Sequence, residues 1–249
     1  MNSTIQDNTA SQAETIAKPK RGRKLFKYLK YAAIGLLAAM LIAHFAWNRS
    51  GSGQWELAKD DGGVKLWTLK TPGSNLVQVK STVRIKSTVS GMLVLLEDLD
   101  SCVDAECFDA KMIERLDTPP GHYAAYVRFK FAVPGVHTQE YVLFQQRFQD
   151  PQTKQVKVTL MAAPARIPRD ECCVRITHLY NTWLLTPRAN GELDIEFTQD
   201  TDTGGLPYPV ANLGLIEGTF QVMQDMQDMM NKPRYRVATY ADVKELGQH

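Results

Sequence analysis

The chain has 249 residues, of which 44% are hydrophobic and 22% are charged, with 29 Lys and Arg against 27 Asp and Glu. This composition is typical of a globular protein and excludes the collagen-like, disordered and multi-span membrane classes. The positive charge is concentrated in residues 1–50, which carry eight basic and two acidic side chains, so the remainder is mildly acidic. A mildly acidic body argues against nucleic acid as a partner.

The first fifty residues indicate a basic tail followed by a membrane span. Residues 1–30 are polar and then strongly basic, and we expect them to form a disordered cytoplasmic tail. Residues 31–47 are apolar apart from His44, and these seventeen residues make roughly 26 Å of helix, close to the ~30 Å of a hydrocarbon core. Seven cations precede this run and only Arg49 soon follows it, which predicts a cytoplasmic N-terminus.

A cleavable signal peptide is the competing interpretation of this region. Small residues do not occupy the −3 and −1 positions of an obvious cleavage site, because a cut after Ala46 places His44 at −3. We therefore expect an uncleaved, single-pass anchor in the inner (cytoplasmic) membrane, with the rest of the chain on the periplasmic side. Residues 48–54 contain several Ser and Gly and are predicted to form a flexible linker.

From residue 55 to about residue 237 the chain is predicted to form one mixed domain, and residues 238–249 a C-terminal tail. The pattern predicts the start of a helix at 55–59, a turn at 60–63, strands at 64–69 and 77–85, and an amphipathic helix at 87–99. Further strands are expected at 111–116, 122–131, 140–149, 155–161, 173–185 and 192–199. Several of them alternate as half-buried antiparallel strands do.

A long amphipathic helix is predicted from about Pro207 to Met230, and Pro233 ends it. Apolar residues recur in it at three- and four-residue spacing, namely Leu206, Val210, Leu213, Ile216, Phe220, Met223, Met226 and Met230. The fold class is thus α+β, an antiparallel sheet that this helix must cover. Gly214 and Gly218 each cost the helix about 1 kcal/mol relative to alanine, which indicates either a soft point or a close approach to the sheet.

Four segments occur in an order and at separations that a known family shares. They are Trp55 with Gly63-Val64-Lys65-Leu66-Trp67, then Glu140-Tyr141-Val142, then Val174-Arg175-Ile176 with Trp183-Leu184-Leu185-Thr186-Pro187, and finally Asp202-Thr203-Gly204-Gly205-Leu206-Pro207. Over about residues 55–231 the chain resembles the START (steroidogenic acute regulatory-related lipid transfer) family. The resemblance implies a helix-grip fold, in which a curved antiparallel sheet grips the long C-terminal helix around a lipid-sized tunnel.

The predicted tunnel and its lid provide the candidate ligand-binding residues. They are Tyr126, Arg128, Gln145, Met161, Trp183, Leu206, Val210, Leu213, Phe220 and Met223. Apolar cavities suit apolar ligands, and the methionines of the last helix adapt to irregular guests, although a methionine stripe also simply packs a core. The expected partners are therefore a lipid or other hydrophobic molecule and a membrane.

The resemblance aligns Arg128 with an acidic position, and Gln145 with an arginine position, of a buried pair that many family members have. An unpaired buried cation is costly, so an inward-facing Arg128 requires an anionic partner from a neighbouring strand or from the ligand. A guanidinium suits a carboxylate or a phosphate, which makes an anionic headgroup a plausible ligand feature. A register shifted by one residue turns Arg128 outward instead. Arg175 resembles a frequent family arginine and suits an ion pair.

Motifs that would identify an enzyme, a metal site or a cofactor are missing. The sequence has no G-x-S-x-G, H-E-x-x-H, G-x-G-x-x-G or phosphate-loop pattern. Cys172 and Cys173 are a poor metal site, and adjacent cysteines also bond poorly to each other. Cys102 and Cys107 flank a short acidic turn, and an oxidising compartment favours a disulfide between them; free thiols in a reducing compartment are the alternative.

Two functions from different classes follow from the sequence. The first is a non-enzymatic, membrane-anchored module that binds and transfers one hydrophobic molecule. The second is an enzyme on the same grip fold, such as an aromatase/cyclase of polyketide type or a thioesterase, which requires an acid or base in the pocket. Arg128 with His122 or His137 is the candidate set for that chemistry. A lower-ranked interpretation is a sensor whose ligand changes a partner-binding surface.

Overall fold

The computed structural model of the protein describes residues 21–132, 136–240 and 242–247. It consists of two units, Met1–Trp47 and Asn48–His249. The first unit contains most of helix α1 (Arg21–Arg49), which has 29 residues. Within α1, Lys24–Arg49 is long and apolar enough to cross a membrane.

Helix α1 begins ten residues before the predicted span 31–47. Residues 21–30, which we expected in the disordered tail, are helical, since Lys, Arg and Leu have favourable helix propensities. Residues 1–20, the rest of that predicted tail, lie outside the described residues.

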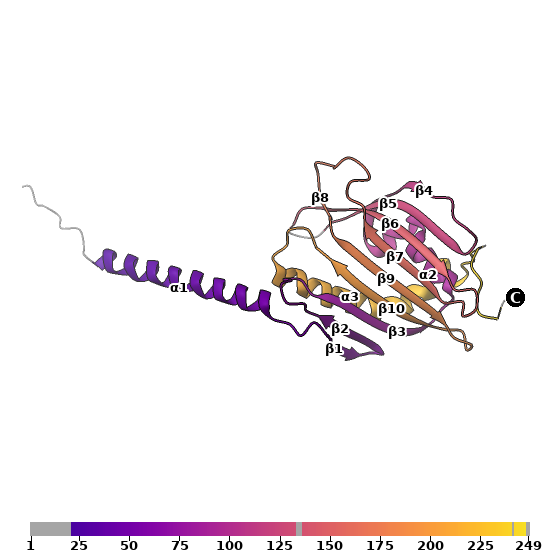
Figure 1. Ribbon diagram of the computed structural model, residues 1–249, viewed down its shortest axis with the longest axis horizontal. Coiled ribbons are helices and arrows are strands. Elements are labelled where there is room, and N and C mark those ends of the chain that lie inside the picture. The colour runs from indigo at the N-terminus through magenta and orange to yellow at the C-terminus, as the bar shows by residue number, and fades with distance from the viewer. Residues whose placement is uncertain (1–20, 133–135, 241, 248–249) are drawn as a thin grey trace, which may run out of the picture. The chain divides into compact units, whose positions relative to one another are not determined.

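The second unit is built on one ten-stranded sheet (Figure 1). Nine strands follow one another antiparallel across it, in the order β1 (Trp55–Asp61), β2 (Val64–Leu69), β3 (Gln78–Lys86), β10 (Glu192–Thr201), β9 (Leu179–Pro187), β7 (Val156–Ala162), β6 (Gln139–Gln149), β5 (His122–Phe131) and β4 (Cys107–Arg115). The two-residue strand β8 (Val174–Arg175) lies off this path and pairs parallel with the start of β6.

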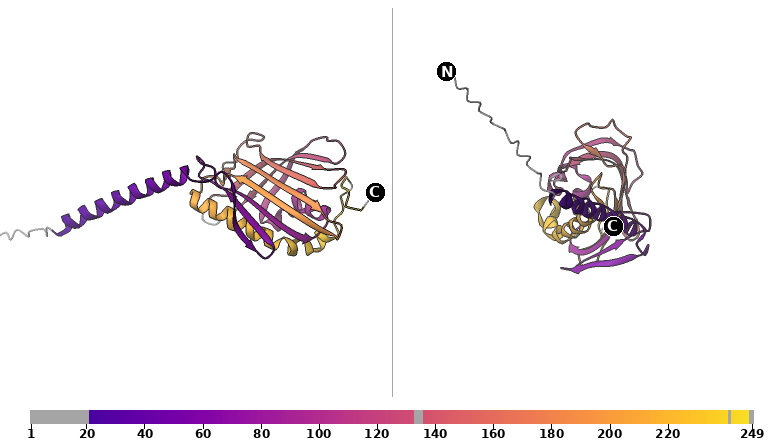
Figure 2. Two further views of the ribbon diagram at one scale, coloured as in Figure 1. Left: turned by 60° about the horizontal axis from the view of Figure 1, so that its bottom comes forward. Right: turned by 90° about the vertical axis from the view of Figure 1, so that its left-hand side faces the viewer.

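Alternation along the strands gives the sheet an inner and an outer face. In β3, for example, Val79, Ser81 and Val83 are buried, whereas Lys80 and Arg84 between and after them are not. The sheet curves, and its inner face is the one that helix α3 (Tyr208–Asn231) covers (Figure 2). The predicted α+β architecture is therefore confirmed.

Helix α3 is fixed to the sheet by apolar and polar side chains in different parts of its length. Its buried residues are Ala211, Asn212, Leu215, Thr219, Phe220, Met223, Met226 and Met230. Asn212 accepts a hydrogen bond from the Val77 N–H and donates one to the Asn75 carbonyl, both at 3.0 Å. Thr219 donates to the side-chain oxygen of Gln199 at 3.0 Å. The first half of the helix thus combines these hydrogen bonds with the burial of Ala211 and Leu215, whereas the second half depends on the packing of Phe220 and the methionines.

Shorter elements close the far end of the inner face. They are helix α2 (Val89–Glu97), the 3-10 helix η1 (Leu99–Ala105) and helix α4 (Pro233–Arg236). After α4, residues 237–240 and 242–247 form what we call the C-terminal strap. Gln149 of β6 donates to the Lys244 carbonyl and accepts from the Lys244 N–H, at 2.8 and 2.9 Å. The described part of the predicted tail 238–249 therefore packs on the domain.

Three segments differ from their expected structure. The predicted helix start at 55–59 is strand β1, because a tight turn brings it against β2, and pairing overrides local preference. The predicted strand 173–185 is interrupted between β8 and β9. The predicted linker is hydrogen-bonded to the β2–β3 connection, where Asn48 accepts from the Gly73 N–H at 2.7 Å and the Gly53 N–H donates to Lys70 at 3.1 Å.

The first residues of strand β6 are buried on both faces of the sheet. Glu140 is fully buried on the outer face, beneath the connection 163–173. Arg175 of β8 donates to the Glu140 carboxylate at 2.7 Å and to the carbonyls of Pro164, Ile167 and Pro168. The predicted ion pair of Arg175 is thus an interior one, which fixes a long connection to the sheet.

Replacing Arg175 with alanine is expected to lower the free energy of unfolding by about 3–5 kcal/mol, because it leaves the Glu140 carboxylate buried without its cation. Urea unfolding of the full chain measures the loss. The matched control is Arg84→Ala, which removes an exposed arginine that pairs with Asp194, and its effect should be much smaller. Equal losses in the two variants would contradict the structural role given to Arg175.

Candidate functional site

A lane of apolar side chains follows the inner face of β5, β6 and β7. Its buried members on β5 and β6 are Tyr123, Ala125, Val127 and Leu143. Around them lie side chains that are only partly buried, namely Leu99, Phe129, Tyr141, Leu160 and Ala162. These residues face the interior and still keep accessible surface. They are therefore the part of the inner face that an apolar ligand could contact.

Beyond Tyr141, at the first residue of β6, a pocket lies beside the N-terminus of α3. This mouth pocket has a volume of about 210 Å³ and is lined by Val136, His137, Gln139, Val174, Gly204, Gly205 and Leu206. Gln139 donates to the Thr203 carbonyl at 2.5 Å and accepts from the Tyr141 hydroxyl at 2.8 Å. These two bonds connect the first residues of β6 to the turn that precedes the helix.

The other end of the lane is polar and buried. Arg147 lies on the inner face of β6, eight residues or about 27 Å of strand from Gln139. Its side chain and that of Glu97 at the end of α2 are each 1% exposed, and the Arg147 Nε lies 3.4 Å from a Glu97 carboxylate oxygen. Arg147 Nη2 also donates to Asp242 of the strap at 2.5 Å. The aromatic rings of Tyr123 and Tyr240 lie 5.6 and 5.4 Å from the guanidinium carbon.

This polar end is incompletely hydrogen-bonded. Among the described residues, the two carboxylate oxygens of Glu97 and Nε and Nη1 of Arg147 make no hydrogen bond of good geometry. Arg147 Nε does form an ion pair with Glu97, and the Tyr240 hydroxyl also interacts with the Glu97 carboxylate. Buried polar groups are nearly always paired in native proteins, so unpaired atoms at the end of an apolar lane identify a site that could take a polar group of a ligand.

Burial and charge shift the pKa values of the groups around Arg147. Burial raises the pKa of Glu97 to about 7, although the Arg147 charge opposes this shift. Burial, and then the Glu97 charge, raise the pKa of both Tyr123 and Tyr240. Near neutral pH, Glu97 therefore exchanges a proton easily, while both tyrosines stay neutral hydrogen-bonding groups.

Several predicted ligand-binding residues do lie on the inner side. Gln145 is buried and donates to the Leu96 carbonyl at 2.9 Å. Trp183 stacks on Phe197 with ring centroids 4.1 Å apart, beneath the helix. Phe220 and Met223 are in the buried stripe of α3, and Leu206 lines the mouth pocket.

Other predicted residues lie away from the interior. Tyr126, Arg128 and Met161 alternate with inward-facing residues of β5 and β7 and are on the outer face. Val210 and Leu213 of α3 are 56% and 60% exposed. The helix is rotated from the predicted face in its first turns, because the short residue Ala211 and the hydrogen-bonding Asn212 and Thr219 occupy the contact positions there.

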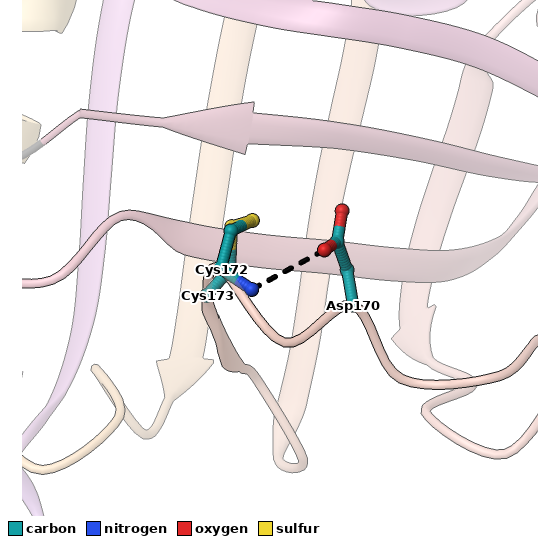
Figure 3. A group of neighbouring side chains, drawn as sticks. All are labelled: Asp170, Cys172 and Cys173. Carbon is teal, nitrogen blue, oxygen red and sulfur yellow. Dashed lines mark hydrogen bonds between the residues drawn. A yellow bond between two sulfur atoms is a disulfide. The ribbon is translucent and has the colours of Figure 1, made fainter.

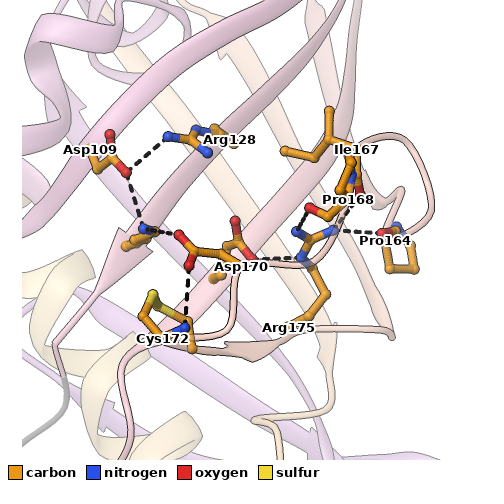
Figure 4. Close-up of polar contacts among 11 residues, drawn as sticks. Asp109, Arg128, Pro164, Ile167, Pro168, Asp170, Cys172 and Arg175 are labelled. Atoms are coloured by element: carbon orange, nitrogen blue, oxygen red, sulfur yellow. Dashed lines mark hydrogen bonds and ion pairs between the residues drawn. A yellow bond between two sulfur atoms is a disulfide. The ribbon is translucent and has the colours of Figure 1, made fainter.

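Arg128 belongs to an ion-pair network on the outer face (Figure 4). Its Nη2 donates to Asp109 at 3.0 Å, and Lys130 contacts both Asp109 and Asp170 at 3.1 and 2.8 Å. Hydrogen bonds from Lys111 and Lys130, together with the charge of Arg128, lower the pKa of Asp109 to about 2. Of the two alternatives for Arg128, the structure has the outward one, with an anionic partner supplied by β4 rather than by a ligand.

The four cysteines form two disulfides. Cys102 and Cys107, the predicted pair, are bonded with Cα atoms 4.9 Å apart. Cys172 and Cys173 are also bonded, contrary to our expectation for adjacent cysteines. They are the last two residues of the connection 163–173, directly before strand β8. The ligand atoms of Asp170, Cys172 and Cys173 lie within 4.8 Å of one another (Figure 3). Bonded sulfurs offer no thiolate, however, so in the oxidised form the Asp170 carboxylate is the one strong metal-binding donor of this group.

The histidines proposed for an enzymatic alternative do not converge with Arg128. His122 is exposed and packs against Phe148 with ring centroids 4.9 Å apart, whereas His137 lines the mouth pocket at the opposite end of the strand pair. The predicted acid–base set is therefore not assembled.

Sequence reasoning missed Arg147, Glu97, Tyr123, Tyr240 and Asp242. One signal was available, since Arg147 follows Gln145 by two residues and must share its face in a strand. The partners carried no such signal. Glu97 and Asp242 come from a helix and a strap that lie 50 and 95 residues from Arg147 in the sequence.

Both glycines of α3 are on its outer side. A Cβ atom added at Gly214 or Gly218 would meet nothing within 4 Å. The alternative in which these glycines allow a close approach to the sheet is therefore wrong, and their remaining consequence is a weaker helix.

A second hollow lies on the outer face and has a different chemistry. It has a volume of about 410 Å³, and its lining includes Lys65, Arg84, Asp194 and Glu196. Charged walls of both signs do not suit an apolar molecule, so this groove is not the candidate site.

Comparisons with known proteins agree with the fold. No protein-family model matches the sequence. A Pseudomonas aeruginosa protein described as uncharacterized is 24% identical over 205 residues, which are 80% of this chain and 98% of that protein. A solved STAR-related lipid transfer protein from Xanthomonas axonopodis is 22% identical, with a TM-score of 0.60, and the match covers 70% of this chain and 98% of that one.

Two human structures extend this likeness. The lipid transfer and protein localization domain of StarD13 has a TM-score of 0.63 at 12% identity, covering 78% of this chain and 96% of that domain. STARD10 has a TM-score of 0.63 at 15% identity, covering 77% and 78%. At these identities the likeness shows the fold, which is that of the STAR-related lipid transfer domains.

The Glu97 pKa predicts how stability depends on pH. Because the folded-state pKa of about 7 lies above the ordinary value of 4.5, the folded protein binds this proton more tightly than the unfolded chain does. Ionisation therefore opposes folding, and stability falls as pH rises from about 4.5 to 7, by roughly 3 kcal/mol for this group.

Glu97→Gln should remove that decline, as measured by urea unfolding at pH values from 4.5 to 8. The exposed Glu217→Gln is the matched control and should leave the decline in place. A wild-type slope in the Glu97→Gln variant would show that Glu97 does not have the raised pKa.

Proposed function

We propose that the protein binds one lipid or other hydrophobic molecule between its sheet and helix α3, and transfers it while anchored to a membrane by α1. The observation that carries this proposal is the lane of inward-facing, partly accessible apolar side chains, Phe129, Tyr141 and Leu160 among them, on the face of the sheet that α3 covers from its β2–β3 side. Burial of an apolar molecule there is favourable by roughly 25 cal/mol per Å². The solved structures of the same fold that are named lipid transfer proteins support the same function.

Uptake of a lipid requires the interior to enlarge. Ligand pockets usually have volumes of about 300–1,000 Å³, and the mouth pocket has about 210 Å³. The N-terminal half of α3 borders that pocket, begins without a side-chain cap and contains two unpacked glycines. Movement of this half away from the sheet would join the mouth pocket to the apolar lane, and we assign it the role of a lid.

The basic residues around the apolar run and the two disulfides support a membrane topology for the proposed anchor. Seven basic residues precede the apolar run and Arg49 follows it, which favours a cytoplasmic N-terminus and a periplasmic lipid-binding domain at the inner membrane. Two disulfides are consistent with an oxidising compartment. Asn48, the first residue of the second unit, directly follows the apolar run, so chain continuity would keep the domain near its own bilayer.

An enzyme on this fold is the second candidate, and one observation favours it. Glu97 is buried, has a pKa of about 7 and lies near two tyrosines and an arginine, which is the environment of a general acid or base. The Glu97→Gln variant distinguishes the two candidate functions. A carrier would still transfer lipid, whereas an enzyme would lose its turnover.

Stiffening the lid should slow lipid exchange. Gly214→Ala and Gly218→Ala together are expected to raise the stability of the protein by about 1–2 kcal/mol, because the added methyl groups meet no neighbour. The same pair should slow the release of a bound lipid, as measured by stopped-flow dequenching of a fluorescent lipid. The control is Gly73→Ala in the β2–β3 connection, where a positive φ makes alanine unfavourable. Unchanged release by the stabilised lid variant would contradict the lid role.

The transfer itself is tested with the full chain reconstituted into vesicles that contain a self-quenched fluorescent lipid. Mixing with unlabelled acceptor vesicles should give faster dequenching than protein-free vesicles do. Leu160→Trp, which fills the lane, should abolish the acceleration, whereas Leu57→Trp, at an exposed position on β1, should preserve it. Equal rates with and without protein would sink the proposed function.

A further inference from the structure

The C-terminal strap places a carboxylate on the buried arginine at the end of the lane. Asp242 is 40% exposed, whereas the Arg147 side chain it contacts is 1% exposed. The carboxylate thus enters the interior from the surface. Arg147 belongs to a central strand and cannot leave, so the strap is the partner that can separate from the pair.

The described part of the strap is fastened mainly by polar contacts, and its Tyr240 ring lies 5.4 Å from the Arg147 guanidinium carbon. Besides Asp242, the Lys244 backbone pairs with Gln149, and the Glu245 carboxylate accepts from the Val89 and Ser90 N–H groups at the start of α2, at 3.1 and 2.8 Å. Val243 is its one described large apolar residue that is buried. Each net hydrogen bond contributes only about 1 kcal/mol to stability in typical proteins, so local release of this segment requires much less than global unfolding.

The chemistry at Arg147 allows an exchange of one carboxylate for another. The guanidinium has five N–H donors, and within the described residues Nε and Nη1 make no hydrogen bond. If a ligand carboxylate replaced that of Asp242, the net charge of the buried group would be unchanged. The desolvation cost would therefore stay similar, and the free donors would gain acceptors.

The apolar lane sets what such a carboxylate must be attached to. It follows β6 from Arg147 towards the mouth pocket over about 27 Å of strand. Its members Ala125, Val127 and Leu143 are buried, so a ligand would have to displace the side chains that cover them. A molecule with its carboxylate at Arg147 would place its tail along Ala125, Val127 and Leu143 towards Tyr141.

We infer that Arg147 binds the carboxylate of a fatty-acid-like amphiphile, and that Asp242 occupies this position in the empty protein as a displaceable mimic of the ligand. This inference rests on the proposed function and names its ligand class. The strap then acts as a competitor, since the ligand is retained only where its carboxylate takes the guanidinium from Asp242.

The test uses the full chain in phosphatidylcholine nanodiscs, with binding of radiolabelled palmitate, hexadecanol and lysophosphatidate measured after subtraction of empty nanodiscs. Asp242→Asn should bind palmitate about tenfold or more tightly than the wild type, because one charge-assisted competitor is gone. Binding of the uncharged hexadecanol should not change. Asp225→Asn, on the exposed side of α3, is the matched control and should resemble the wild type.

A second measurement follows the strap directly. Saturating palmitate should speed hydrogen exchange at the Lys244 N–H, whereas hexadecanol should not. Arg147→Gln should lose palmitate binding at least tenfold and keep hexadecanol, and the Asp242→Asn result stands independently if that variant does not fold.

The outcomes separate the two proposals. Unchanged or weaker palmitate binding by Asp242→Asn, or no change at the Lys244 amide, overturns the competition. A larger gain for lysophosphatidate than for palmitate overturns the carboxylate assignment in favour of a phosphate. Binding of hexadecanol but not palmitate leaves the proposed function standing without this inference, and failure of all three probes removes the proposed function itself.

Discussion

The alternation of side chains along β5 and β6 is the constraint on which the site depends. A strand turns successive side chains to opposite faces, so a shift of one residue exchanges the interior with the exterior. In this register β5 sends Tyr123, Ala125 and Val127 inward and Arg128 outward. The same register makes Arg147 of β6 the inward cation. Which arginine could meet a ligand is therefore decided by pairing, not by composition.

The two buried charged residues of β6, Glu140 and Arg147, are stabilised in different ways. On the outer face, Glu140 is neutralised by Arg175, whose remaining donors bind three carbonyls of a connection that covers them. That group serves the fold, although one Glu140 carboxylate oxygen, Oε1, makes no hydrogen bond within the described residues. On the inner face, Arg147 faces Glu97 and Asp242, and several of their atoms make no hydrogen bond within the described part of the chain. The inner group has four such atoms, against one in the outer group, and it lies at one end of an apolar lane. Because unsatisfied buried polarity is costly, this combination favours a functional site on the inner face.

The sequence was sufficient for those features that depend on local periodicity. The last helix, most of the strands and the fold class follow from patterns of period 3.6 and 2, and the methionines at 223, 226 and 230 are buried as expected. Prediction failed where the sequence allowed either of two faces of a strand or helix to be the buried one. In Tyr126-Val127-Arg128-Phe129, either face could have been the inner one. Likewise, Val210 and Leu213 are more apolar than the Ala211 and Asn212 that contact the sheet. The partners of Arg147 were beyond reach because they lie on other elements.

The two halves of α3 have unequal reasons to remain on the sheet. Burial of a large apolar side chain contributes roughly 1.5–3 kcal/mol, so Met223, Met226 and Met230 fix the second half strongly. The first half buries one large apolar side chain, Leu215, and adds the hydrogen bonds of Asn212 and Thr219, which each contribute about 0.5–1.5 kcal/mol net. It also carries two glycines that contact nothing. Partial detachment is therefore cheapest at the N-terminal end, beside the mouth pocket, while the methionines act as the hinge.

The buried arginine lies at the opposite end of the lane. If the lid opens at one end and the anion site lies at the other, an amphiphile has to enter headgroup first, and its headgroup has to cross the apolar lane. That crossing is easier for a neutral, protonated acid than for a charged group. A fatty acid satisfies that condition because it crosses neutral and ionises beside Arg147, whereas a permanently charged headgroup does not.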